Sequence, residues 1–105
     1  MVEPSKRDWK LYRANIGKWQ EHYMEKLVKE YADYLRSDLP ASTKFWEMEK
    51  RIRRDRKKPG VYIEIRRSTI FWDVAGLVRD QVISMDDLEE FSDEFKEAVA
   101  SILRI

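Results

Sequence analysis

The chain has 105 residues, and its 21 Lys and Arg against 20 Asp and Glu leave a net charge of only +1 although 39% of the residues are charged. With 43% apolar and 12% aromatic residues, this composition excludes a wholly disordered chain and predicts one globular domain spanning 1–105. No apolar run reaches the roughly 18 residues of a membrane span, so we expect a cytoplasmic protein without a membrane partner. The absence of Cys and the single His exclude disulfides, thiolate chemistry and the usual zinc clusters.

Apolar residues recur every three or four positions over the first third of the chain, which predicts one helix from about Ser5 to about Arg36. Ser5 followed by Asp8 is typical of a capping box, and Gly17 marks a candidate kink or break. The members of the stripe are Trp9, Tyr12, Ile16, Trp19, Tyr23, Leu27, Tyr31 and Tyr34.

Two further helices are predicted in the middle of the chain. Ser42 is the expected cap of the first, whose inner face shows Phe45, Met48 and Ile52 and which Pro59 and Gly60 end. From residue 61 onward, apolar and polar residues alternate as in a strand. The longer period that continues to residue 81 and the lack of a second strand favour a helix beginning at 61.

Two capping signals follow close together near the C-terminus. Ser84 with Asp87 predicts a short helix at 85–91, and Ser92 with first-turn carboxylates predicts a final helix at 93–104. The fold class is therefore all-α, a single small bundle of four to five helices with a long aromatic-rich first helix.

Several segments together resemble a known family. These are the spacing WxxYxxxxxxW from Trp9 to Trp19, the run KFWEMEKRI, the junction PGV, and the run DLEEFSDEFKEAV. In this order they resemble a family of small uncharacterised helical proteins from Firmicutes, some of them labelled multidrug transporters. The resemblance implies no catalytic residues, and it implies a proline near Gly17 in many relatives, which favours a helix break there. The transporter label conflicts with the lack of a membrane-spanning segment.

The strongest local anomaly is the basic run KRIRRDRKK at 50–58, where seven of nine residues are Lys or Arg. Between Lys44 and Arg67, 10 basic residues face 4 acidic ones, a net charge of +6. A helix places an aromatic ring beside several cations, a pattern that suits stacking of a base and neutralisation of phosphates. Candidate contacts to phosphate or to an acidic partner are Trp46, Lys50, Arg53, Arg54, Lys57 and Lys58.

A structural interpretation accounts for the same run. Glu47 and Glu49 each precede an arginine by four residues, which predicts intrahelical ion pairs. The last cations complement the carbonyl end of the helix. On this interpretation Trp46 is a core ring with Arg53 stacked on its edge.

An acidic segment balances the basic one. From Arg79 to Ile105 there are 8 acidic and 3 basic residues, a net charge of −5. The spacing lacks the central glycine of an EF-hand loop, so no metal and no cofactor is predicted. The basic and acidic segments are instead expected to face each other within the bundle or across a homodimer.

The remaining candidates are aromatic residues and isolated polar ones. The first helix carries a wider apolar sector than one buried side requires, so Trp9, Tyr12, Trp19 and Tyr23 form a candidate interface. His22 has no nucleophile or second histidine placed by a motif, so an enzyme is not predicted. The sequence favours a non-catalytic protein-interaction or regulatory module with a protein partner or a second copy of itself. The alternative is a nucleic-acid-associated regulator that uses the basic second helix.

Overall fold

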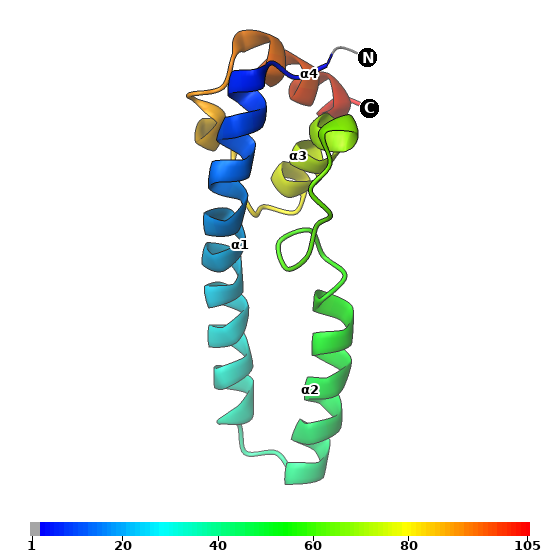
Figure 1. Cartoon of the computed structure of the whole chain (residues 1–105). Helices are drawn as coiled ribbons and strands as arrows, with labels where there is room; N and C mark the ends of the chain where they lie inside the picture. The colour runs from blue at the N-terminus through cyan, green and yellow to red at the C-terminus, as the bar shows by residue number, and fades with distance from the viewer. Residues whose placement is uncertain (1–2) are drawn as a thin grey trace.

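The computed structural model describes residues 3–105, and these contain four α-helices and no strand, which confirms the all-α prediction (Figure 1). The helices are α1 (Lys6–Leu35), α2 (Ala41–Asp55), α3 (Ile70–Arg79) and α4 (Asp93–Leu103). Two short 3₁₀ turns, η1 (Arg67–Thr69) and η2 (Met85–Leu88), precede α3 and α4.

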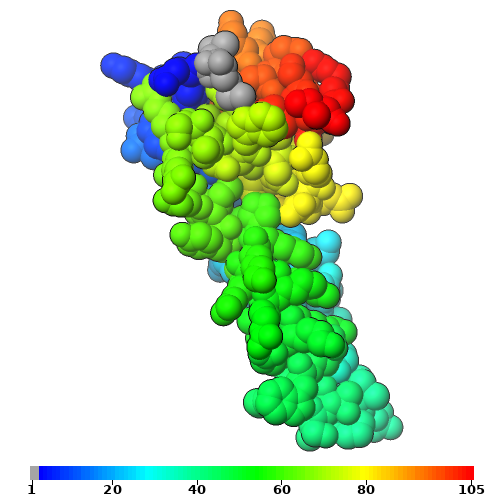
Figure 2. Space-filling view, turned by 90° about the vertical axis from the view of Figure 1, so that its right-hand side faces the viewer, coloured from blue at the N-terminus to red at the C-terminus, as the bar shows by residue number. Residues whose placement is uncertain are grey.

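Helix α1 runs along the whole molecule and packs against different partners in its two halves (Figure 1). Its N-terminal half lies with α3, η2 and α4, and we call this part the head. Its C-terminal half lies antiparallel to α2, and we call the pair, residues 21–58, the stalk. The molecule measures 52 × 22 × 22 Å, and its radius of gyration of 16.6 Å exceeds the roughly 13 Å of a compact chain of this length. Figure 2 shows the stalk as a narrow extension below the head.

Nearly all of the buried apolar side chains belong to the head. On α4, residues at i, i+4 and i+7 face inward, as an amphipathic helix requires. The rings of Phe91 and Phe95 lie 4.6 Å apart, and those of Phe71 and Phe95 lie 5.1 Å apart. The core consists of Tyr12, Ile16, Ile70, Phe71, Val74, Ala75, Leu77, Val82, Ile83, Leu88, Phe91, Phe95, Val99 and Ile102.

The predicted helix starts are largely confirmed. Ser5 Oγ accepts from the Asp8 backbone N–H, Ser92 Oγ accepts from the Phe95 N–H, and Ser84 forms a reciprocal capping box with Asp87. The Asp8 carboxylate does not return to Ser5. It accepts from the backbone N–H of Ser92 at 3.0 Å and from its hydroxyl, and thereby joins the first turn of α1 to the start of α4.

The predicted cap at Ser42 is wrong. Pro40 occupies the N-cap position of α2, and no side chain caps this end. Pro40 has a preset φ and lacks an N–H, so the helix begins directly after it and leaves Ser42 exposed within the first turn.

The predicted helix from residue 61 is wrong for residues 61–66, which connect the stalk to the head without regular structure. An extended chain advances about 3.3 Å per residue, whereas a helix advances about 1.5 Å. The segment therefore connects the stalk to the head in fewer residues than a helix would need. The alternation therefore marks a half-buried extended segment without a partner strand, and Ile63 packs on the core. The break at Gly17 is also absent, because α1 continues through it. The predicted helix at 85–91 is limited to the 3₁₀ turn at Met85–Leu88.

Candidate interaction surface

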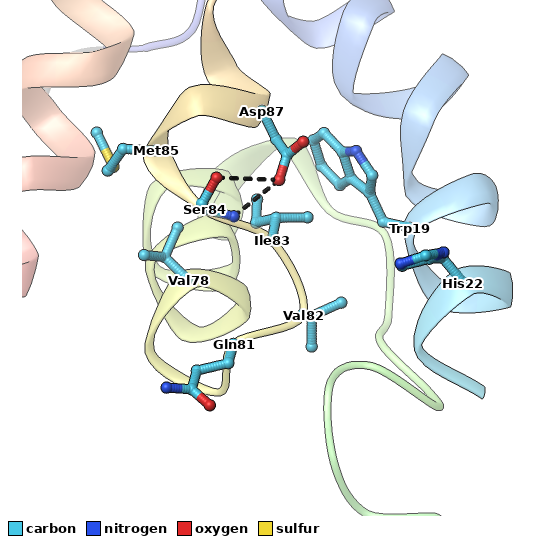
Figure 3. A pocket seen from close by; sticks show the side chains of 9 residues that line it. All are labelled: Trp19, His22, Val78, Gln81, Val82, Ile83, Ser84, Met85 and Asp87. Carbon is cyan, nitrogen blue, oxygen red and sulfur yellow. Dashed lines mark hydrogen bonds between the residues drawn. The ribbon is translucent and has the colours of Figure 1, made fainter. Parts of the chain in front are cut away.

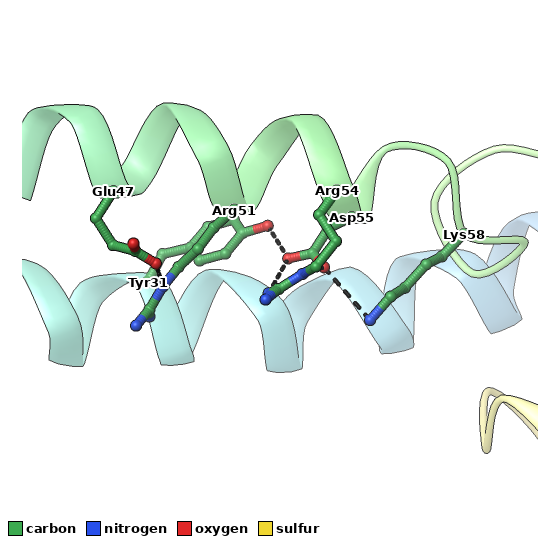
Figure 4. A network of polar contacts seen from close by, with 6 residues as sticks. All are labelled: Tyr31, Glu47, Arg51, Arg54, Asp55 and Lys58. Atoms are coloured by element: carbon green, nitrogen blue, oxygen red, sulfur yellow. Dashed lines mark hydrogen bonds and ion pairs between the residues drawn. The ribbon is translucent and has the colours of Figure 1, made fainter.

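The two helices of the stalk are joined mainly by polar contacts on one side (Figure 4). Tyr31 of α1 donates its hydroxyl proton to the Asp55 carboxylate of α2, and the side chain of Asp55 is only 2% exposed. Arg54 Nε donates to the same carboxylate at 3.0 Å, and Lys58 Nζ lies 3.4 Å from it. One buried carboxylate therefore holds one hydroxyl and two cations at the junction of the stalk with the head.

Charge and hydrogen bonding set the ionisation of this group. Burial raises the pKa of Asp55, but the hydrogen bonds from Arg54 and Tyr31 outweigh it and lower the pKa to about 2. Burial and the bond to Asp55 raise the pKa of Tyr31 to about 12. The carboxylate stays ionised through the neutral range and is already partnered, so it is a structural group of the stalk.

Most of the predicted cationic contacts are occupied within the chain. The predicted intrahelical pairs are confirmed, since Arg51 Nε lies 2.9 Å from Glu47 and Arg53 pairs with Glu49. Arg54 and Lys58 bind Asp55. Lys57 lies beyond the end of α2, so the helix does not place it beside Trp46 and Lys50.

Trp46, the aromatic member of the predicted set, is exposed. Its side chain is 65% exposed and meets the Phe45 ring edge-on, with 5.0 Å between centroids. The interpretation of Trp46 as a core ring is therefore wrong. A shallow groove with a volume of about 340 Å³ separates it from Lys50, which forms no ion pair among the described residues.

Two grooves with many apolar side chains also lie along the stalk, and charged residues border them. A groove of about 510 Å³ runs past Leu35, Phe45, Met48 and Ile52. A second groove of about 260 Å³ continues from Ile52 along α1, and the two grooves share Ile52 and Arg56. We call this surface the hairpin face. Val61 lines its end toward the head, and its apolar residues within the stalk are Met24, Leu27, Val28, Tyr31, Leu35, Phe45, Met48 and Ile52.

The exposure of the hairpin face is large for apolar side chains. Val28 is 62% exposed, Leu35 47%, Phe45 65% and Ile52 49%, whereas Leu27 alone among the eight is buried. The wide apolar sector on the first helix indicated such a surface in sequence. It did not show which end of the helix stays uncovered, because that depends on where the head packs.

The predicted aromatic interface lies mostly against the core of the head. Tyr12 is fully buried, and burial together with the charge of Asp73 raises its pKa. Trp9 and Trp19 are half-buried and stack on neighbouring aromatics. The Tyr23 ring covers Gly60. These rings pack on the core of the head, and Tyr12 has no exposed surface that a partner could contact.

The basic and acidic segments do not meet within the chain. Among residues 3–105, the ion pairs of the basic segment go to Glu47, Glu49, Asp55, Glu64 and Glu3. Those of the acidic segment, Lys96 with Asp93 and Arg104 with Glu97, are internal to it. The basic run at 50–58 lies in the stalk and the acidic segment lies in the head (Figure 1), so the fold separates most of their charges.

A further groove, about 710 Å³ in volume, lies in the head between α1 and the loop after α3 (Figure 3). His22 and Trp19 line one wall, and Ser84 and Asp87 line the other. The Asp87 carboxylate accepts from the Ser84 backbone N–H at 2.8 Å and from its hydroxyl at 3.4 Å. This carboxylate serves as a helix cap, and the groove brings no activated nucleophile next to His22.

Over residues 3–105, no helix is long and apolar enough to cross a membrane, and no three acidic or histidine side chains come together as metal ligands. No family model, curated protein or solved structure matches the chain. The resemblance to the Firmicutes family therefore stays a prediction, and a function can be proposed only from the geometry of the stalk.

Proposed function

We propose that this protein is a non-catalytic interaction module and that the hairpin face is its binding surface. The observation that carries the proposal is the apolar side of the stalk, where side chains that a monomer normally covers line a continuous groove. Aromatic and arginine side chains border it, and these residue types contribute most at protein interfaces.

Complete burial of a Val, Leu, Ile or Phe side chain contributes about 1.5–3 kcal/mol, so the exposed halves of Val28, Leu35, Phe45 and Ile52 leave about 1 kcal/mol each for a partner. A few such anchors around one groove supply enough free energy for specific binding. The cations Arg51, Arg53, Arg54 and Lys58 are paired within the chain and offer much less.

Site-specific photo-cross-linking tests this proposal. A photoreactive amino acid replaces Phe45 or Ile52, and in a matched control it replaces Trp72, which is 50% exposed but lies on α3 in the head. In the cells that make the protein, we expect a discrete protein adduct from positions 45 and 52 and none from 72. Absence of adducts at both stalk positions in folded protein contradicts the proposal, as does equal labelling at position 72.

A second candidate function is nucleic-acid binding by the basic side of α2, and the exposed Trp46 beside Lys50 favours it. Replacement of Lys50, Arg53 and Lys57 together by Glu is expected to abolish a binding signal that weakens steeply with salt. Gel-shift titration with duplex and single-stranded probes at about 50 mM salt measures this. No shift of the wild-type protein with either probe removes the candidate.

A further inference from the structure

We propose that the partner of the hairpin face is a second copy of this chain, packed antiparallel so that the two stalks form a four-helix bundle. The inference rests on the proposed function, since it uses the same surface. It names the occupant from the geometry and the charge distribution of the stalk.

The geometry of the stalk suits a partner of the same shape. The hairpin is a single layer of two helices, and the stable solution for such a layer is a second helical layer against its apolar side. A second hairpin brings a layer of equal length and identical side-chain sizes. A two-fold axis makes the contact self-complementary, since each residue meets the same set of neighbours in both copies.

Ile52 marks the centre of this contact. It lines both grooves of the hairpin face, with Phe45 and Met48 toward the tip on one side and Arg56 on the other. On α1, Leu35 lines the groove on the tip side of Ile52, and Met24, Leu27, Val28 and Tyr31 line the groove on the other side. A two-fold axis near Ile52 therefore superposes apolar groove on apolar groove along both helices.

The charges of α2 select the antiparallel orientation. Residues 41–49 contain one Lys and two Glu, a net charge of −1, whereas residues 50–58 contain seven cations and one Asp, a net charge of +6. Parallel packing places the two +6 ends together, and the repulsion between them is costly at an interface that excludes water. With the axis near Ile52, antiparallel packing instead places residues 50–58 of one copy against residues 47–55 of the other, whose net charge is only +1.

The borders of the groove give this arrangement a specific contact. Glu49 and Arg56 both line the groove and lie three residues before and four residues after Ile52. With the axis near Ile52, Glu49 of each copy faces Arg56 of the other. In a parallel pair, Glu49 faces Glu49 and Arg56 faces Arg56.

Sedimentation equilibrium of the purified full chain provides the first test, at concentrations from about 1 to 500 µM. We expect the mass to rise from 12.7 kDa toward twice that value. Ile52→Glu, a change at a half-exposed position, is expected to raise the dissociation constant at least about tenfold. The matched control Trp72→Glu, at a position of equal exposure in the head, is expected to dimerise like wild type. A wild-type monomer throughout the range overturns the inference, and so does an Ile52→Glu variant that is folded and dimeric.

A charge exchange tests the orientation without introducing a charge into the apolar groove. Glu49→Arg and Arg56→Glu are each expected to weaken the dimer about threefold to tenfold, because each brings like charges together. Glu49→Arg also removes the pair with Arg53 of its own helix, but that loss is common to the monomer and the dimer. The double variant restores the cross-copy pair and is expected to return to within about twofold of wild type. A double variant as weak as the sum of the single changes overturns the antiparallel arrangement.

These outcomes separate the two proposals. If the purified chain is monomeric but positions 45 and 52 cross-link to a different protein, the hairpin face is a binding surface with another occupant. In that case the second copy fails and the interaction module stands. If the chain is monomeric and neither position cross-links, both fail.

Discussion

The turn at Pro59–Gly60 docks the end of the stalk onto α1, and replacement of its glycine tests that contact. Gln20 Nε2 donates to the Pro59 carbonyl at 3.0 Å, which holds the turn against the helix. A Cβ placed on Gly60 lies 2.7 Å from both Cε2 and Cγ of the Tyr23 ring, closer than real Cβ contacts allow. Since φ at Gly60 is not positive, close approach to Tyr23 is the reason for glycine at this position.

The expected size of the effect follows from this overlap. Forcing a methyl group into a filled space costs about 1–3 kcal/mol, and the lower entropy of the unfolded alanine chain returns about 0.4–1 kcal/mol. Gly60→Ala is therefore expected to lower the free energy of unfolding by about 1–2 kcal/mol. For a domain of this size, that corresponds to a fall in Tm of about 4–16 °C.

The same chain supplies a matched control. At Gly17, in the interior of α1, a Cβ meets nothing within 4 Å, so Gly17→Ala is expected to stabilise by about 1 kcal/mol. Urea and thermal unfolding followed by far-ultraviolet circular dichroism measure both variants. A Gly60→Ala protein as stable as wild type, or stabilised like Gly17→Ala, refutes the packing of Gly60 against Tyr23.

Three further predictions concern side chains that join elements of the fold. Asp8→Ala leaves the Ser92 N–H without its buried acceptor and is expected to cost about 1–3 kcal/mol in urea unfolding; no loss contradicts the link between α1 and α4. Asp55 has a folded pKa of about 2 against an ordinary 3.8, so its stabilisation is present above pH 3.8 and is lost as the pH falls toward 2. Asp55→Asn is expected to lower Tm at pH 7 and to flatten its fall over that window, and an unchanged acid profile contradicts the shift. Gln81 has a φ of 61° just after α3, where its backbone N–H and that of the next residue bond to the last carbonyls of the helix. Because a side chain is strained at this φ, Gln81→Gly is expected to raise the free energy of unfolding by about 1 kcal/mol in thermal unfolding. A decrease in stability contradicts strain at this position.

The local signals in the sequence predicted the helices well where each helix end carries its own chemistry. Ser5, Ser84 and Ser92 cap as expected, because the capping hydroxyl oxygen and the backbone N–H that donates to it lie within three residues of each other. The pairs of Glu47 with Arg51 and Glu49 with Arg53 form for the same reason. Such contacts do not depend on what the helix packs against.

At the connection 61–66, the local sequence pattern did not predict the structure. The longer apolar period favoured a helix there, but residues 61–66 have no regular structure and run from the stalk to the head. Likewise, the N-cap position predicted for Ser42 is occupied by Pro40, two residues earlier. In both cases a neighbouring constraint outweighed a weak local preference.

The candidate site divides in the same way between sequence and structure. Local sequence patterns were enough to predict the helical class, the caps at Ser5, Ser84 and Ser92, the intrahelical ion pairs, and the division of charge into a basic and an acidic segment. Only the tertiary structure decided that Tyr12 is buried while Phe45 and Trp46 are exposed, that Asp8 binds Ser92 across the chain, and that the two charged segments lie apart. The physical reason is that apolar periodicity shows which face of a helix seeks cover, whereas the cover itself comes from residues distant in sequence. In the stalk the described chain supplies no such cover, and for this reason we propose that a second copy supplies it.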